Sequence, residues 1–128
     1  LLIIGLTTYA AVWQSQGEAE ITFEKTTHNF GSFPESSPKV TCVFQIQKIR
    51  EMVPLVIHQA IASCGCTVPQ YPKEPIKPGE SGQITVTYNG AGKFPGHFKK
   101  SITIRTNGKN EMTRLYIEGD MLPKDAKQ

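Results

Sequence analysis

The sequence contains little of what most enzyme sites are made of. Its 128 residues include three cysteines, three histidines and one tryptophan. It has no Ser-His-Asp spacing, no glycine-rich phosphate loop between a strand and a helix, and no helical stretch whose N-terminus would bind an anion. Its carboxylates are scattered along the chain. We therefore expect a protein that is not an enzyme and has no catalytic or cofactor-binding residues.

A strong charge of one sign is also missing. The 14 Lys and Arg residues and the 11 Asp and Glu residues leave a formal net charge of +3. Lys99-Lys100 is the only adjacent basic pair, and no basic patch with interleaved aromatic residues is present. Because nucleic-acid binding depends on such patches, we expect no nucleic-acid partner.

What the chain does contain suits one β-rich domain. A length of 128 residues fits a single domain, and 38% hydrophobic with 20% charged residues can support a buried core. Nine prolines and eleven glycines interrupt the chain often, which favours short strands over long helices.

The N-terminal stretch differs from the rest. Residues 1–13, LLIIGLTTYAAVW, carry no charge and are fewer than the roughly 20 apolar residues that span a bilayer. Such a run is typical of a secretory signal peptide, and Gly17 and Ala19 are small residues at the positions that a signal peptidase reads. We expect residues 1–19 to be a signal peptide without its charged start, or an N-terminal anchor that stays attached. The domain is then exported, with no membrane insertion after signal removal.

Beyond the N-terminal stretch the apolar residues recur with a period of two. This pattern predicts six or seven short strands, over residues 20–31, 40–46, 54–63, 83–90, 96–109 and 112–121. Asn107-Gly108 is a favoured pair for a tight hairpin, and the Pro-rich residues 69–82 read as a connection. We expect an all-β domain over residues 20–121, an immunoglobulin-like antiparallel β-sandwich of about seven strands, and a flexible tail over residues 122–128.

Cys42 shares the apolar face of its strand with Val40, Phe44 and Ile46. A cysteine in such a place acts as a small hydrophobic side chain, so we expect Cys42 to belong to the structural core. The later strands offer no cysteine to form the disulfide of antibody domains, so the core depends on apolar burial.

Cys64 and Cys66 flank a glycine in the stretch ASCGCTVP. In an extended chain residues i and i+2 point to the same side, so both sulfurs can reach one ion, and thiolates favour Cu(I) or Zn(II). The pair supplies only two of the four ligands of a structural zinc site. The others would come from a second molecule or from the three histidines, His28, His58 and His97.

Two other interpretations of Cys64 and Cys66 stay open. The thiols form a candidate disulfide, although Cα atoms two residues apart in an extended chain approach the roughly 7 Å limit, so closure needs a bend that Gly65 permits. Such a small ring would be strained and easily reduced, which suits redox chemistry. Alternatively, SCGCT is only a corner of small residues at the end of a strand.

Residues 21–119 contain four stretches that carry a family resemblance, namely THNFGSF, PLVIHQAIASCGCTVP, PIKPGESGQITVTYN and GHFKKSITIRTN. Together they resemble a family of exported bacterial proteins, the domain of unknown function 1573. The resemblance implies an exported bacterial immunoglobulin-like sandwich. We therefore expect the chain in the periplasm or outer envelope of a bacterium, and we expect protein partners there. It implies no activity and no catalytic residues.

Two features depart from the family pattern. Asn29 stands where the family usually has Asp, and QIQKIREMV at residues 45–53 replaces an Asn-Thr-Gly-Asp type turn. Codons for Lys-Ile-Arg-Glu-Met-Val exist that give this turn in another frame, so we hypothesise that Gln45–Val53 is a short frame-shifted segment. We expect Ile49, Met52 and Val53 to be exposed there, and the segment to be the least stable part of the domain.

These observations lead to two functional hypotheses. In the first, the chain is a binding or assembly module of the bacterial cell envelope that acts through exposed strand edges and loops. In the second, it is a thiol-dependent factor that binds copper or zinc, or exchanges disulfides, through Cys64 and Cys66. Two free, low-pKa thiols that take up one Cu(I) would favour the second hypothesis.

Overall fold

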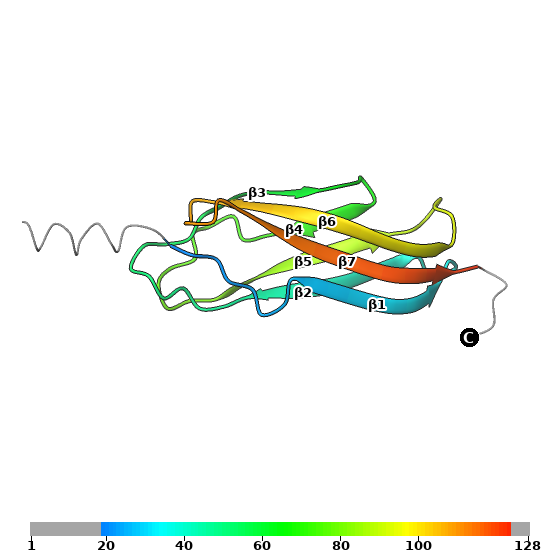
Figure 1. Cartoon of the computed structure of the whole chain (residues 1–128), viewed down its shortest axis with the longest axis horizontal. Coiled ribbons are helices and arrows are strands. Elements are labelled where there is room, and N and C mark those ends of the chain that lie inside the picture. Colours follow the sequence, from blue (N-terminus) through cyan, green and yellow to red (C-terminus); the bar gives the residue numbers. More distant parts are fainter. Residues whose placement is uncertain (1–18, 124–128) are drawn as a thin grey trace, which may run out of the picture.

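Seven strands and no helix make up the described part of the chain, residues 19–123 of a computed structural model (Figure 1). The strands are β1 (Thr27–Pro34), β2 (Lys39–Ile46), β3 (Ile57–Ala62), β4 (Thr67–Gln70), β5 (Gly82–Asn89), β6 (Gly96–Thr106) and β7 (Met112–Leu122). The predicted all-β class is confirmed. Within these residues no helix is long and apolar enough to cross a membrane.

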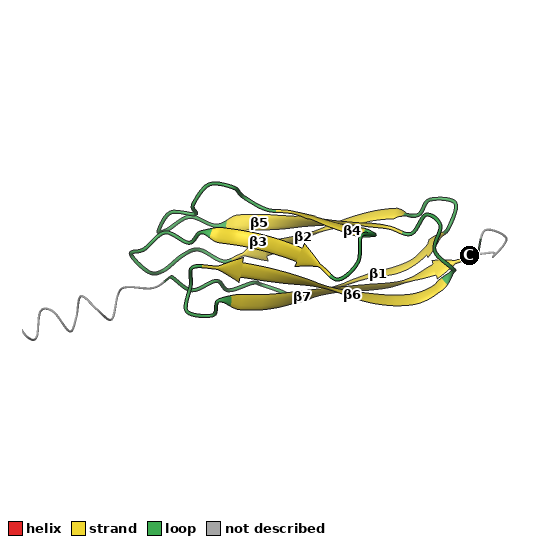
Figure 2. Cartoon of the chain, turned by 90° about the horizontal axis from the view of Figure 1, so that it is seen from above, coloured by secondary structure: helices red, strands yellow, loops and turns green. Residues whose placement is uncertain are grey.

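The strands form two sheets, and the strands of both run roughly along the long axis of the domain (Figure 2). The four-stranded sheet has the order β1-β7-β6-β3, and the three-stranded sheet has the order β2-β5-β4. This is the predicted immunoglobulin-like sandwich. One pair, β1 and β7, runs parallel while the others are antiparallel. These two strands lie at opposite ends of the sequence, so no hairpin fixes their relative direction.

One face of each sheet is apolar and buried. On β2 and β5 alternate residues turn inward, and the residues between them are exposed or half-buried. Tyr88 of β5 stacks on Phe98 of β6 with ring centroids 3.9 Å apart, a contact that joins the two sheets. The largest fully buried side chains come from both sheets and from the β2–β3 connection: Ile46, Ile49, Leu55, Ile84, Val86, Ile102, Ile104, Leu115, Ile117 and Met121.

The first strand begins at Thr27, later than predicted, and continues past Gly31. Its register with β7 shifts after Asn29, and Gly31 has a φ of 72°, which glycine adopts at little cost. Asn29 Oδ1 accepts a hydrogen bond from the Gly31 amide at 2.8 Å, and Asn29 Nδ2 donates to Glu118 Oε1 at 3.4 Å. An aspartate would lack that donor and would face the Glu118 carboxylate, so Asn29 suits its neighbour.

β4 begins before the predicted Pro-rich connection and extends into it. The strand contains Pro69 and pairs only with β5, so it lies at a sheet edge. Proline is tolerated there because one side of an edge strand needs no backbone donor. The expectation that residues 69–82 form only a connection is therefore wrong at its start.

The β6–β7 connection is longer than the tight hairpin that Asn107-Gly108 predicts. Residues 107–111 separate the strands, and neither Asn107 nor Gly108 has a positive φ. Asn107 Oδ1 accepts from the Val56 amide at 2.8 Å, and its Nδ2 donates to the Pro54 carbonyl at 3.2 Å. The hairpin prediction is wrong because Asn107 holds the β2–β3 connection in place instead of turning the chain.

The segment Gln45–Val53, for which we hypothesised a frame shift, fits into the fold. Ile49 is 2% exposed, its amide donates to the Glu80 carbonyl at 3.0 Å, and its carbonyl accepts from the Gly79 amide at 2.8 Å. The expected exposure of Ile49 is wrong, because the turn at residues 79–80 supplies its backbone partners and the core receives its side chain. Met52 is 74% exposed, as expected, whereas Val53 is half-buried and not exposed as predicted.

The predicted N-terminal signal peptide or anchor and the predicted tail lie almost wholly outside the described residues. Ala19 is buried, and its carbonyl accepts a hydrogen bond from the Lys109 amide at 2.9 Å. The packed domain therefore includes the last residue of the predicted N-terminal segment. β7 includes Leu122, which lies just beyond the predicted end of the domain.

Replacing Ile49 by Ala should lower the free energy of unfolding by about 2–5 kcal/mol, because it removes a buried side chain and leaves a cavity. Met52→Ala is the control in the same segment, and it should change that free energy by less than about 0.5 kcal/mol. Urea unfolding of the two variants measures both values. Equally small effects would contradict the burial of Ile49.

Candidate functional site

The Cys64–Cys66 pair lies where the chain passes from one sheet to the other. β3 ends at Ala62 at the edge of the four-stranded sheet, and β4 begins at Thr67 at the edge of the three-stranded sheet. Ser63 fastens this corner to β6, since its amide donates to the Ser101 carbonyl at 2.9 Å and its Oγ accepts from the Ser101 amide at 3.2 Å.

The corner is a tight turn closed by a disulfide between Cys64 and Cys66. The Thr67 amide donates to the Cys64 carbonyl at 3.2 Å, which bends the chain. This bend brings the two Cα atoms to 5.3 Å, well inside the range of disulfides, rather than near the limit expected for an extended segment. The disulfide and the corner are therefore one feature of the structure, while a redox role of the pair stays a prediction.

The backbone conformation at position 65 does not require a glycine. Its φ is not positive, and a Cβ built on it would meet no atom within 4 Å. The bend at this corner thus does not depend on the conformational freedom of glycine. The missing side chain instead leaves open space beside the disulfide.

The two sulfurs have different surroundings. Cys64 Sγ accepts a hydrogen bond from the Cys66 amide at 3.3 Å. Cys66 is half-buried and packs against the core. The residue Thr67 is only 4% exposed. Its hydroxyl oxygen lies 3.7 Å from Cys66 Sγ and 4.0 Å from Cys64 Sγ. Each sulfur therefore has a polar donor beside it.

Cys42 lies apart from this pair, in the core. It is 5% exposed and is a free cysteine. Burial raises the pKa of its thiol to about 11, so the reactive thiolate is scarce at neutral pH.

The three histidines lie in three separate settings. The His28 ring contacts Phe30 edge-on with centroids 4.7 Å apart, and the carbonyl of His58 accepts from Tyr71 Oη at 3.4 Å. His97 Nδ1 lies 3.1 Å from Asp120 Oδ1 on the neighbouring strand. Within residues 19–123 no three His, Cys, Asp or Glu side chains are grouped so that they could hold a metal ion. Metal binding by a reduced Cys64 and Cys66 stays a prediction.

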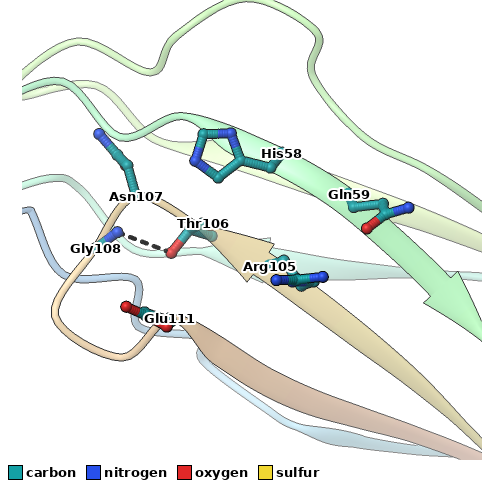
Figure 3. A pocket seen from close by; sticks show the side chains of 7 residues that line it. All are labelled: His58, Gln59, Arg105, Thr106, Asn107, Gly108 and Glu111. Carbon is teal, nitrogen blue, oxygen red and sulfur yellow. Dashed lines mark hydrogen bonds between the residues drawn. The ribbon is translucent and has the colours of Figure 1, made fainter.

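A polar groove lies at the end of β6, beside β3 (Figure 3). Exposed His58 and Arg105 line it from the two strands, and Glu111 lines it from the loop. The Gly108 amide donates to Thr106 Oγ1 at 3.1 Å, a bond that shapes the loop. The residues of β3 and β6 are far apart in the sequence and meet only through the β3–β6 pairing, so no local pattern indicates the groove.

The outer faces of the two sheets differ in charge. On β2, β5 and β4 the cross-strand rows are Thr41–Thr87–Val68, Val43–Thr85–Gln70 and Gln45–Gln83. We call these eight residues the uncharged face. Lys39 is the only charged residue in the three strands, and it lies at the start of β2. By contrast, the outward positions of β6 and β7 carry five charged residues, namely Lys99, Arg105, Arg114, Glu118 and Asp120.

The uncharged face also exposes apolar side chains. Val43 is 50% exposed and Val68 is 54% exposed. Between them Thr41 Oγ1 and Thr87 Oγ1 lie 3.1 Å apart and hydrogen bond to each other, so these hydroxyls satisfy one another in part. The sequence carried the signal for this surface, since the two long strands alternate without a charge after Lys39.

The family described as a protein of unknown function, DUF1573, matches residues 21–121. This chain belongs to the DUF1573 family. The match includes both sheets and the Cys64–Cys66 corner, and it confirms the resemblance found in the sequence. A comparison with curated proteins gives no significant match.

Solved structures share the fold of this DUF1573 chain at low sequence identity. A protein of unknown function from Porphyromonas gingivalis W83 has a TM-score of 0.67 at 14% identity, over 80% of this chain and 47% of that chain. The PapD-like domain 7 of human CEP192 has a TM-score of 0.64 at 8% identity, over 86% and 89%. The Pseudomonas aeruginosa CupB2 chaperone has a TM-score of 0.51 at 15% identity, over 83% and 57%. These similarities show the fold, and the chain spans about half of the P. gingivalis protein.

Removing the disulfide of this DUF1573 domain should change its stability little. A bridge over so short a loop restricts the unfolded chain least, so Cys64→Ser/Cys66→Ser should lower the free energy of unfolding by less than about 2 kcal/mol. Urea unfolding under oxidising conditions measures the difference. A loss of more than about 4 kcal/mol would contradict this account and make the bridge a main support of the fold.

Proposed function

We propose that this DUF1573 chain is an exported binding or assembly module of the bacterial cell envelope, which docks a protein partner on its uncharged face. The apolar residues 1–13 support export, and the family resemblance supports the bacterial envelope. This role needs binding and no catalysis.

The observation that carries the proposal is the difference between the two outer faces. Charged residues are depleted at the centres of protein interfaces, because burying an unpaired charge is costly. The uncharged face meets this condition over three strands, and it exposes Val43 and Val68. The opposite face, with the charges of β6 and β7, does not meet it.

The chemistry of the face defines the partner. Threonine, valine and glutamine side chains on a sheet suit a protein surface that is itself uncharged and offers hydrogen bonds. β4 forms one border of the face and pairs only with β5. A partner that covers the face therefore also reaches an edge strand, where an extended segment can add to the sheet.

Thr85→Lys should abolish partner binding, because it places a charge at the centre of the uncharged face. Thr85 lies outward on the central strand β5, between Val43 and Gln70. The chain carrying an affinity tag is incubated with a solubilised envelope fraction, and retained proteins are quantified by mass spectrometry. Proteins retained by the unaltered chain should fall at least about tenfold with Thr85→Lys, which corresponds to 1.4 kcal/mol or more.

Thr103→Lys is the matched control. Thr103 is also a half-buried threonine in the middle of an interior strand. However, it faces outward on the four-stranded sheet, whose strands β6 and β7 carry charged residues. This variant should retain the same proteins as the unaltered chain. If both lysine variants retain the same proteins in the same amounts, the uncharged face is not the docking surface.

A further inference from the structure

The Cys64–Cys66 corner has features that the proposed binding role does not use. The disulfide spans a single residue, so it adds little to the stability of the fold. Gly65 leaves open space beside it. Both cysteines are only half-buried, unlike Cys42 in the core. A bridge that is accessible and of little structural value is open to exchange with other thiols.

The backbone of the corner is held without the bridge. The Thr67 amide donates to the Cys64 carbonyl, and the Asn89 amide donates to the Cys66 carbonyl at 2.8 Å. Ser63 is bound to β6 on the other side of the turn. Reduction therefore leaves two thiols in fixed positions, which are close enough to form the bridge again.

The surroundings of the sulfurs assign different roles to them. The Cys66 amide points at Cys64 Sγ from 3.3 Å, and such a donor stabilises a thiolate on Cys64. Cys66 packs against the core, and the Thr67 hydroxyl lies 3.7 Å from its sulfur. Cys64 is thus suited to form a disulfide with a sulfur of another molecule. Cys66 is placed to attack Cys64 in that mixed disulfide and so release the other molecule.

We propose that the Cys64–Cys66 disulfide is a thiol–disulfide exchange site, in which Cys64 forms the mixed disulfide with a dithiol protein and Cys66 is the resolving thiol. This activity is independent of docking on the uncharged face. Its substrate class is a protein or peptide with two cysteines.

The exchange balances without a further reactant. A substrate thiolate attacks Cys64 Sγ, the bond to Cys66 breaks, and Cys66 leaves as a thiolate that takes up a proton. The second substrate thiolate then attacks the substrate sulfur of the mixed disulfide and releases Cys64 as a thiolate, which also takes up a proton. Two substrate thiols are oxidised to one disulfide, and Cys64 and Cys66 are reduced to two thiols. In the reverse direction the Cys64 thiolate attacks a substrate disulfide, and Cys66 resolves the product.

Trapping with oxidised glutathione tests the assignment of the two cysteines. In Cys66→Ser, Cys64 should form a glutathione adduct at least about ten times faster at pH 7 than Cys66 does in Cys64→Ser, because only Cys64 has the amide donor. Mass spectrometry follows each adduct over time. Cys64→Ser/Cys66→Ser measures the background reaction of Cys42, which should be negligible. Circular dichroism checks that all three variants are folded.

The unaltered chain provides the second measurement, which needs no variant. Mixed with a reduced peptide that contains two cysteines, the oxidised chain should yield one oxidised peptide for each reduced Cys64–Cys66 pair. Equal adduct rates for the two single variants, faster reaction at Cys66, or a bridge that stays oxidised in excess dithiol peptide would each overturn the proposal. None of these outcomes bears on the Thr85→Lys experiment, so the two proposals fail separately.

Discussion

The two sheets bury their apolar faces, and the stack of Tyr88 on Phe98 joins them. This burial determines which side chains of each strand turn inward, because neighbouring residues of a strand point to opposite faces. It leaves the outward positions of the three-stranded sheet mostly to threonine, valine and glutamine, and about half of those of β6 and β7 to charged residues. The burial of the core thus determines which residues form the two outer faces, and the residue types at those positions make the contrast in charge.

The same packing determines where the cysteine pair lies. A chain that adds β3 to one sheet and β4 to the other must cross between the sheets in the few residues from 63 to 66. That crossing needs a tight turn, and its hydrogen bonds to Ser101 and Asn89 hold the turn at both ends. The half-buried environment of Cys64 and Cys66 follows from this position at the side of the sandwich. Cys42, on the inward face of β2, has no such access.

Strict alternation made most of the fold predictable. β2 and β5 alternate so regularly that their inward residues, from Cys42 to Ile46 and from Ile84 to Tyr88, follow from the sequence. β4 did not follow from it, because Pro69 argues against a strand unless the strand is known to lie at an edge. Ile49 was misplaced for a similar reason: its partners at Gly79 and Glu80 are distant in sequence, and local composition gives no sign of them.

The candidate site was only partly predictable. The Cys-Gly-Cys motif was evident, but an extended chain was assumed where the structure has a turn, so the two Cα atoms were expected farther apart than 5.3 Å. The different surroundings of the two sulfurs depend on the Cys66 amide and on Thr67, whose positions are set by that turn. The polar groove beside β3 is formed by the pairing of β3 with β6, so no short stretch of the sequence indicates it.

Site-specific photocrosslinking in living cells tests the central claim, that the uncharged face binds a protein partner. A photoreactive amino acid placed at Thr87 lies on the uncharged face, and one placed at Thr103 lies on the outer face of the four-stranded sheet. If the uncharged face is the docking surface, illumination should link the chain to an envelope protein from position 87. The same protein should not be linked from position 103. Crosslinks only from position 103, or an identical pattern from both positions, would contradict it.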